Sequence, residues 1–301
     1  MIDPLKITEI FCHIDDFCSA FVPKLHSQQL AAGKSRLKPN SLTDSEIMTI
    51  QVLFHFSGIR TFKKYYLDYV STQLGEWFPG LPSYSRMVEL CSSTILHLGV
   101  YLKEFATGPC SGISFIDSTP LRVCHNRRIH SHKVFDGLAQ RGQCSIGWFF
   151  GFKLHLVTND TGQIVDFMVT PGNTDDRQPL KSSGFTSKLY GKLVGDKGYI
   201  GKELFDALFD QGIHLLTKLK KNMKTKLVTP LSDAILLRKR AICETIIDQL
   251  KNIFQIEHSR HRSPANFFTN LFSALIAYNF ADKKPSLTQD VCQHSNQLVF
   301  F

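Results

Sequence analysis

No hydrophobic run in the 301-residue sequence approaches the roughly 20 residues that a membrane-spanning helix needs. The first residues, Met-Ile-Asp-Pro-Leu-Lys, also lack the basic and then apolar order of a signal peptide. We therefore expect a cytoplasmic protein. With 43% hydrophobic and 20% charged residues, the chain can bury a core and is long enough for two domains.

The eight cysteines are scattered and form no Cys-x-x-Cys pair, so neither a disulfide scaffold nor a zinc ribbon is indicated. One stretch, Cys124–His132, does combine ligand-like residues, and Cys144 follows it. Its spacing matches no standard zinc finger, and the side chains of Arg127, Arg128 and Lys133 would repel a cation. A basic loop that lies against DNA fits this stretch better than a zinc site.

The formal net charge of +9 is unevenly distributed along the chain. Residues 1–107 hold 10 Lys and Arg and 10 Asp and Glu, whereas residues 108–301 hold 25 basic and 16 acidic residues. A basic excess confined to one region suggests a polyanionic partner.

Residues 1–107 carry the signals of helices. Thr43-Asp-Ser-Glu46 is a capping box, and Ser83 can cap a later helix. A helix-turn-helix that reads DNA through Arg86 and a purely structural subdomain both remain open. We expect helices at Ile7–Val22, from Thr43 to about Gly58, at Phe62–Val70 and at Tyr84–Phe105, with a polar connector at Lys24–Asn40.

Beyond Ala106–Gly112 the pattern changes to strands with interleaved helices, which predicts an α/β domain. The polar turn Asn159–Gly162 predicts an antiparallel hairpin. The predicted strands are Ile113–Asp117, Leu121–Cys124, Gly147–Thr158, Ile164–Thr170, Leu189–Gly195 and Ile213–Lys218, and the predicted helices are Lys202–Gln211, Asp233–Phe254 and Pro264–Ala281. The expected domains are residues 1–107 and 108–282, followed by a polar tail at 283–301.

Two aspartates lie at the ends of predicted strands. Asp117 ends the run Ile113–Ile116, and Asp196 follows the strand at Leu189–Gly195, with glycines around it and Lys197 beside it. An acidic side chain at a strand end can meet a ligand or a metal. Taken singly, Asp196 is better explained as a strand-end residue in a tight turn, because short motifs have many false positives.

Helical geometry places a third carboxylate. At about 100° per residue, Arg240, Glu244 and Lys251 fall within roughly 40° of one another. Alone, this face is explained by solvent exposure and an Arg240–Glu244 pair. Three carboxylates on separate elements are nevertheless what two divalent metals need to activate a water or a 3′-hydroxyl, and Mg²⁺ prefers such oxygen ligands. The apolar stripe of the same helix is Ile242, Ile246, Leu250 and Ile253.

In combination and order, three boxes resemble those of DDE-type bacterial insertion-sequence transposases. The group that they resemble best is the nine-eight-two group of insertion sequences, in which the third box usually begins with tyrosine where this chain has Leu237. The boxes are Phe115-Ile-Asp117-Ser-Thr-Pro120, Gly195-Asp196-Lys-Gly-Tyr199 and Arg240-x3-Glu244-x6-Lys251, and the resemblance extends to Leu42–Tyr66, Gly151–His155 and Thr170–Asn173.

This resemblance implies an RNase-H-like mixed sheet flanked by helices and preceded by an all-helical N-terminal domain. It implies a bacterial, nucleoid-associated enzyme that binds the terminal inverted repeats of its element in double-stranded DNA, cuts the ends and joins them to target DNA. Asp117, Asp196 and Glu244 would be the catalytic residues and would hold two Mg²⁺ ions, for which Mn²⁺ can substitute. Acting on two ends would require a homodimer or a larger assembly.

Other polar residues carry less specific expectations. Lys153 and His155 share one strand face, which either approaches the acids or faces solvent, and Asp175 and Asp176 are expected to cap a helix rather than to bind metal. A nuclease of the same fold that does not join DNA, and an inactive DNA-binding remnant, are the alternative functions. The residues expected to contact DNA, with solvent exposure as the simple alternative, are Arg127, Arg128, Lys133, Lys197, Lys220, Lys221, Arg240, Lys251, Arg260 and Arg262.

Overall fold

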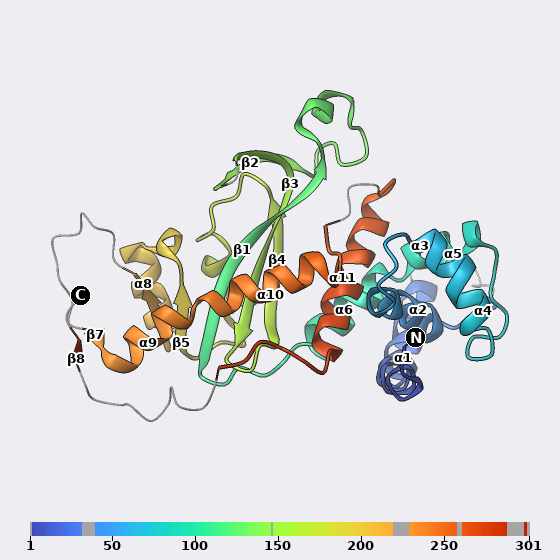
Figure 1. The fold of residues 1–301 in the computed structure, drawn as a ribbon, viewed down its shortest axis with the longest axis horizontal. Helices are drawn as coiled ribbons and strands as arrows, with labels where there is room; N and C mark the ends of the chain where they lie inside the picture. Colours follow the sequence, from blue (N-terminus) through green and yellow to red (C-terminus); the bar gives the residue numbers. More distant parts are fainter. Residues whose placement is uncertain are drawn as a thin grey trace. The chain divides into compact units, whose positions relative to one another are not determined.

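The computed structural model describes residues 2–31, 40–145, 147–218, 229–257, 261–287 and 298–299. The chain forms two compact units, whose elements are labelled in Figure 1. The helical unit is Met1–Ala106 with Leu250–Phe280, and the sheet unit is Thr107–Gln249 with Ala281–Phe301. Residues 250–280, which lie within the predicted domain 108–282, pack with the N-terminal helices.

Helix α2 (Asp44–Phe56) is the centre of the helical unit, because its residues are buried all round from Ile47 to His55. It packs against α1 (Pro4–Ala31) and α11 (Pro264–Phe280). Helix α11 is apolar enough to complete this core, since Phe267, Leu271 and Leu275 are buried. The other segments are α3 (Phe62–Lys64), the π-helix η1 (Tyr65–Val70), α4 (Ser71–Gln73), α5 (Tyr84–Ser93) and α6 (Ile95–Glu104).

The capping box predicted at the start of α2 is confirmed. The hydroxyl of Thr43 accepts a hydrogen bond from the backbone N–H of Glu46 at 3.2 Å, and the Glu46 carboxylate accepts one from the N–H of Thr43 at 2.7 Å. Two N–H groups that the helix leaves unbonded are thereby satisfied. The helix ends at Phe56, and Gly58 then adopts a φ of +68°, which glycine tolerates without steric cost.

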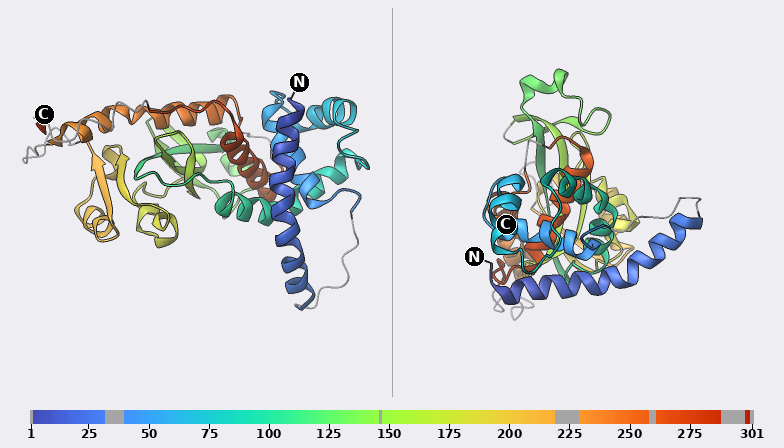
Figure 2. Two further views of the ribbon diagram at one scale, coloured as in Figure 1. Left: turned by 90° about the horizontal axis from the view of Figure 1, so that it is seen from below. Right: turned by 90° about the vertical axis from the view of Figure 1, so that its right-hand side faces the viewer.

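Two helices of this unit differ from their predictions. Helix α1 continues past Pro23 to Ala31, so the connector predicted from Lys24 is helical at its start, and Figure 2 shows α1 as one long helix. The helix predicted over Tyr84–Phe105 divides at Thr94. The Thr94 hydroxyl donates to the carbonyl oxygen of Cys91 at 2.9 Å, which offers that carbonyl an alternative to the helical ladder.

A mixed sheet forms the core of the sheet unit. Strands β4, β3 and β1 are antiparallel neighbours, and β1, β5 and β6 are parallel neighbours. This order, with flanking helices, is the predicted RNase-H-like arrangement, and the predicted hairpin at Asn159–Gly162 joins β3 to β4. The strands are β1 (Ile113–Cys124), β2 (Gln140–Cys144), β3 (Gly147–Asn159), β4 (Ile164–Pro171), β5 (Gly191–Gly195) and β6 (Ile213–Thr217).

The first strand is longer than predicted. The sequence predicts two strands that are separated before Leu121, but β1 runs unbroken through Pro120. Proline lacks the N–H that a central strand would use, yet the pairing of β1 with β5 covers only Ile113–Phe115. At Pro120 the strand therefore pairs with β3 alone, and a proline is tolerated there. Strand β2, a polar segment that the sequence did not predict as a strand, pairs with the start of β3.

Short helices cover one face of this sheet. Buried side chains that include Ile116, Val157, Phe185, Leu193 and Leu208 form a single hydrophobic cluster beneath them. These segments are η3 (Pro179–Lys181), α7 (Ser183–Thr186), η4 (Lys197–Tyr199) and α8 (Lys202–Phe209).

The helix predicted over Asp233–Phe254 is present as α9 (Leu231–Lys239) and α10 (Ala241–Asn252). Arg240 between them keeps right-handed helical angles, with φ −50° and ψ −27°, so the division is slight. Of the predicted polar tail, only residues up to Leu287 and the strand β8 (Leu298–Val299) are described, and β8 pairs with β7 (Thr229–Pro230). No helix in the described ranges has both the length and the apolar character for crossing a membrane.

Candidate active site

Asp117 lies within a strand and not at its tip, which corrects the prediction. It is opposite Leu156 of β3, two residues beyond the last pairing of β1 with β5. One carboxylate oxygen accepts a hydrogen bond from the backbone N–H of Ser118 at 2.8 Å. The side chain is only 19% exposed, so water solvates it poorly.

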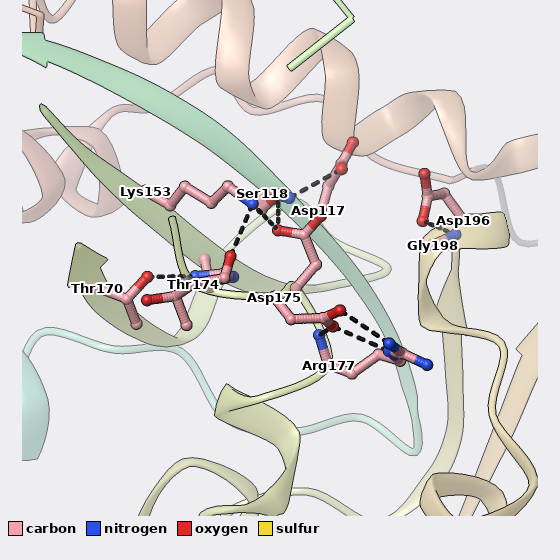
Figure 3. Close-up of polar contacts among 11 residues, drawn as sticks. Asp117, Ser118, Lys153, Thr170, Thr174, Asp175, Arg177, Asp196 and Gly198 are labelled. Atoms are coloured by element: carbon pink, nitrogen blue, oxygen red, sulfur yellow. Dashed lines mark hydrogen bonds and ion pairs between the residues drawn. The ribbon is translucent and has the colours of Figure 1, made fainter. Parts of the chain in front are cut away.

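Asp196 directly follows β5, as predicted. The parallel register places Phe115 of β1 opposite Val194 of β5. Asp117 and Asp196 each follow two residues later, so they lie at the same level along the two segments. Neighbouring strands are about 4.8 Å apart, so the register places the two aspartates, both labelled in Figure 3, on adjacent segments of the chain. The Asp196 carboxylate accepts from the N–H of Gly198 at 2.7 Å, which fixes it at the start of η4.

Glycine at position 195 permits this close approach. A Cβ atom there would lie 3.0 Å from the Tyr199 ring and 3.2 Å from Cγ2 of Ile116. Both contacts are tighter than ordinary van der Waals packing, so a larger residue would require the Tyr199 ring or the Ile116 side chain to shift by a few tenths of an ångström. Glycine avoids that shift at the end of β5, next to Asp196.

Glu244 lies in the first turn of α10 and is tied to Asp117 through Arg240. One guanidinium nitrogen of Arg240 donates to Glu244 at 2.8 Å, and another forms an ion pair with Asp117 at 3.5 Å. The helix is seated on the sheet by Cys243, whose thiol lies 3.6 Å from the hydroxyl of Thr158 on β3. The predicted common face of Arg240 and Glu244 is thus present, and it points toward Asp117.

The other residues predicted for this helix follow the prediction only in part. Ile242, Ile246 and Leu250 are buried, as the apolar stripe predicts, whereas Ile253 is exposed because α10 ends at Asn252. Lys251 forms an ion pair with Glu257 at 3.3 Å.

The three acids influence one another electrostatically. Burial raises the pKa of Asp117 from 3.8 to about 6, and the negative charges of Asp196 and Glu244 contribute to the rise. The N–H of Ser118 and the charge of Arg240 act in the opposite direction. A poorly solvated carboxylate near two other carboxylates is the arrangement that a divalent cation would stabilise most.

The donor set fits a hard cation, because all three side chains offer oxygen ligands. Arg240 supplies the positive charge between Asp117 and Glu244 in this structure. Across the described ranges, however, no group of three or more His, Cys, Asp or Glu side chains is close enough to hold a metal ion, and this includes the stretch Cys124–His132. The three side chains therefore match the ligand type that a hard cation prefers, but their carboxylates do not converge on a single point in this structure.

A polar network on the next residue of β1 was missed by the sequence reasoning. The Ser118 hydroxyl donates to Asp176 at 2.8 Å, and the same carboxylate oxygen accepts from the Lys153 ammonium at 3.0 Å. Lys153 also donates to the carbonyl oxygen of Thr174 at 2.8 Å. Since Ser118 holds Asp117 through its backbone, the Lys153–Asp176 pair anchors the strand at the candidate site.

The neighbouring His155 is fully buried, and its Nε2 lies 2.9 Å from the Thr170 hydroxyl. Burial lowers the pKa of His155 to about 4, so the ring is neutral at physiological pH. Of the two expectations for Lys153 and His155, solvent exposure is wrong. Polar residues in an otherwise apolar strand were the available signal for this network.

Asp175 does not cap a helix, contrary to the prediction. Its carboxylate accepts from the backbone N–H, Nε and Nη2 of Arg177, at 2.9, 2.9 and 2.8 Å. These bonds form a local turn and hold the pKa of Asp175 well below its usual range. The following 3₁₀ helix begins only at Pro179 and has no side-chain cap.

The predicted DNA contacts are distributed over both units. Arg127, Arg128 and Lys133 are exposed in and after η2 (Asn126–Ser131), within the green segment that extends beyond the sheet in Figure 1. Lys197 is exposed beside Asp196. Arg262 is exposed in the helical unit, while Lys220, Lys221 and Arg260 lie outside the described residues.

A family model described as a transposase DDE domain matches residues 107–264. Among solved structures, a synaptic complex of piggyBac transposase with hairpin DNA has a TM-score of 0.35 at 10% identity and covers 72% of this chain. A paired-end complex of Mos1 transposase with the left transposon end has a TM-score of 0.21 at 14% identity, covering 77% of this chain and 81% of that one. The chain spans about half, 49%, of the piggyBac transposase chain. No curated protein sequence matches it.

Proposed function

Because the chain belongs to the transposase DDE-domain family, we propose that it cuts DNA at the ends of a transposable element and joins those ends to target DNA. One observation carries the proposal. Asp117 and Asp196 lie at the same level of neighbouring parallel strands, and Arg240 links Asp117 to Glu244.

Asp117, Asp196 and Glu244 are the residues that would hold two Mg²⁺ ions, or Mn²⁺ in their place. Such ions lower the pKa of a bound water or hydroxyl and stabilise the leaving oxygen of a phosphodiester. The chain's own contribution is orientation. The N–H of Ser118 fixes one oxygen of Asp117, and the N–H of Gly198 fixes one of Asp196.

Arg240 neutralises part of the negative charge of the site and is one candidate for a contact with the DNA phosphates. Lys197 next to Asp196 and the exposed Arg127, Arg128 and Lys133 are the other candidates among the described residues of the sheet unit. Their charges match the basic excess of residues 108–301 and would favour double-stranded DNA as the partner. Two ends handled together would require at least a homodimer.

The three boxes support assignment to the nine-eight-two group of bacterial insertion sequences, with Leu237 as the departure from it. This finer assignment, a location at the bacterial nucleoid and a DNA-end-binding role of residues 1–107 belong to the proposal. Residues 108–282 remain the segment proposed for catalysis, with 250–280 packed in the helical unit.

The test uses the full chain and a labelled DNA fragment that carries the sequences flanking its gene. Asp117→Asn, Asp196→Asn and Glu244→Gln should each abolish Mg²⁺-dependent cleavage while leaving DNA binding intact. Asp248→Asn, an exposed carboxylate one turn after Glu244, is the matched control and should cleave normally.

The products then decide between the functions. Joined products from pre-cut ends support strand transfer, and hydrolysis without joining indicates a nuclease. Binding without either reaction in the wild-type chain indicates an inactive remnant. Unchanged cleavage in all three variants would show that these acids do not form the site.

A further inference from the structure

The helical unit contains a cavity of about 600 Å³ that the proposed chemistry does not use. Residues of α2, α3, α5 and α11 and of the turn before α11 line it, and all of these belong to the helical unit. Figure 1 labels these four helices, and α11 packs against both α2 and α5. The volume is typical of a site for a small molecule or a single building block of a polymer.

Aromatic rings form part of the lining. Phe62 and Tyr84 are both partly exposed, so ring surface is available to a ligand. Their neighbours hold them in place: Phe54 meets Phe62 edge to face with centroids 5.4 Å apart, and Tyr66 lies 6.3 Å from Tyr84. Fixed aromatic rings of this kind favour the stacking of a flat ligand.

Positive charge accompanies the rings. The Lys63 ammonium lies 6.0 Å from the centroid of Tyr84, and Arg262 lines the cavity as a second exposed cation. Among the described residues that line the cavity, none is Asp or Glu. The cavity is therefore suited to a ligand that carries both an aromatic surface and a negative charge.

Amide side chains complete the lining. Asn266 and Asn270 are one turn apart on α11, so they share a face of the helix. Gln51 on α2 donates its amide nitrogen to the Thr94 hydroxyl at 2.8 Å, which fixes the orientation of this third amide. Amides offer a donor and an acceptor side by side, as the edge of a nucleobase requires.

We propose that this cavity binds one nucleotide of an unpaired DNA strand, with the base against Phe62 and Tyr84 and the phosphate near Lys63 and Arg262. Stacking rings beside cations are the general means of binding single-stranded nucleic acid. The proposal rests on the proposed function, because an enzyme that cuts an end and later joins it must hold that end in between. Only an unpaired base exposes the flat surface that the rings can contact.

The experiment measures the affinity of the full chain for a short single-stranded oligonucleotide that contains 2-aminopurine. Tyr84→Leu should weaken binding by about 5- to 150-fold, and it should abolish the quenching of 2-aminopurine fluorescence that stacking on the ring produces. Lys63→Gln and Arg262→Gln should each weaken binding and reduce its salt dependence. Lys64→Gln, which removes an exposed lysine next to Lys63 but outside the lining, is the matched control.

Two results would overturn the inference. One is wild-type affinity in both Lys63→Gln and Arg262→Gln, whose exposed side chains can be replaced without unfolding the protein. The other is equal affinity for free dAMP and for the oligonucleotide, which would assign the cavity to a mononucleotide.

The same proteins are assayed for Mg²⁺-dependent cleavage of element ends. Cavity-dependent strand binding without cleavage by the wild-type chain would refute the proposed function alone. Cleavage by the wild-type chain, with strand binding that no cavity variant alters, would refute this inference alone.

Discussion

Replacement of Asp117 by asparagine should stabilise the metal-free protein at neutral pH, although it removes a proposed catalytic group. The pKa of Asp117 rises from 3.8 to about 6 on folding, chiefly because the side chain is buried. A shift of this size corresponds to about 3 kcal/mol of unfavourable free energy when the carboxylate is ionised in the folded state. Asparagine is uncharged and can still accept the hydrogen bond from Ser118 through its amide oxygen.

The pH dependence gives the sign of the effect. Below 3.8 the carboxyl group is protonated in both states, so the variant gains nothing. As the pH rises from 3.8 to about 6, the Asp117 carboxyl group ionises in the unfolded chain but stays largely protonated in the folded protein, so the wild-type protein loses stability. Above that pH the advantage of Asp117→Asn should be constant, on the order of 1 to 3 kcal/mol.

Urea denaturation in the presence of EDTA over a pH series measures this advantage. The chain has two tryptophans, and a Trp77→Phe background leaves Trp148 on β3 to report on the sheet unit. Asp248→Asn in the same background is the control and should show no comparable pH-dependent gain. A variant that is less stable than the wild type at pH 8, or equally more stable at every pH, would refute the reasoning.

Four further outcomes are expected. Mg²⁺ should stabilise the wild-type sheet unit by about 1.4 kcal/mol per tenfold excess over Kd, measured by calorimetry, and equal stabilisation of Asp117→Asn would contradict the metal site. Arg127→Gln and Arg128→Gln should each reduce the slope of log Kd against log salt by about 1 in anisotropy titrations, whereas an unchanged slope would remove them from the DNA interface. Lys153→Met should lower the free energy of unfolding by about 1 to 3 kcal/mol and reduce end cleavage, because Asp176 loses its cation next to Ser118. Lys153→Arg should retain most activity, and a fully active methionine variant would show that the network does not position the site. Thr43→Ala should destabilise the helical unit by about 1 kcal/mol in urea denaturation followed through Trp77, and no change would mean that the capping box contributes little.

Local signals in the sequence predicted local structure well. The capping box at Thr43 and the hairpin turn at Asn159–Gly162 are short patterns in which each residue interacts with close neighbours, and both are present. The prediction of two strands instead of β1 had the opposite origin. Whether Pro120 interrupts β1 depends on where the pairing of β5 with β1 stops, and β5 begins some 70 residues later in the chain.

Long-range packing also explains why helix α11 belongs to the helical unit. Its apolar sequence predicts a buried helix in either unit, and only the surfaces of α2 and α6 decide which one. The Lys153–Asp176 pair was missed for a similar reason. Sequence alone could not show that Asp176 faces Ser118, because the segment between β4 and η3 has no regular period that would orient its side chains.

The candidate site depends on two such long-range facts, and each removes one ambiguity of the sequence. Strand periodicity predicted that Asp117 and Asp196 belong to strand-like segments, but their proximity requires the parallel register of Phe115 with Val194. A shift of one residue would place the two side chains on opposite faces of the sheet. Helical periodicity likewise placed Arg240 and Glu244 on one face without saying what that face meets. The contact between Cys243 and Thr158 places α10 on the same face of the sheet as Asp117. Thr158 lies opposite Phe115, and Phe115 shares a face with Asp117 because the two are two residues apart on β1. A substitution that displaces either contact should therefore separate the three acids even though it alters none of them.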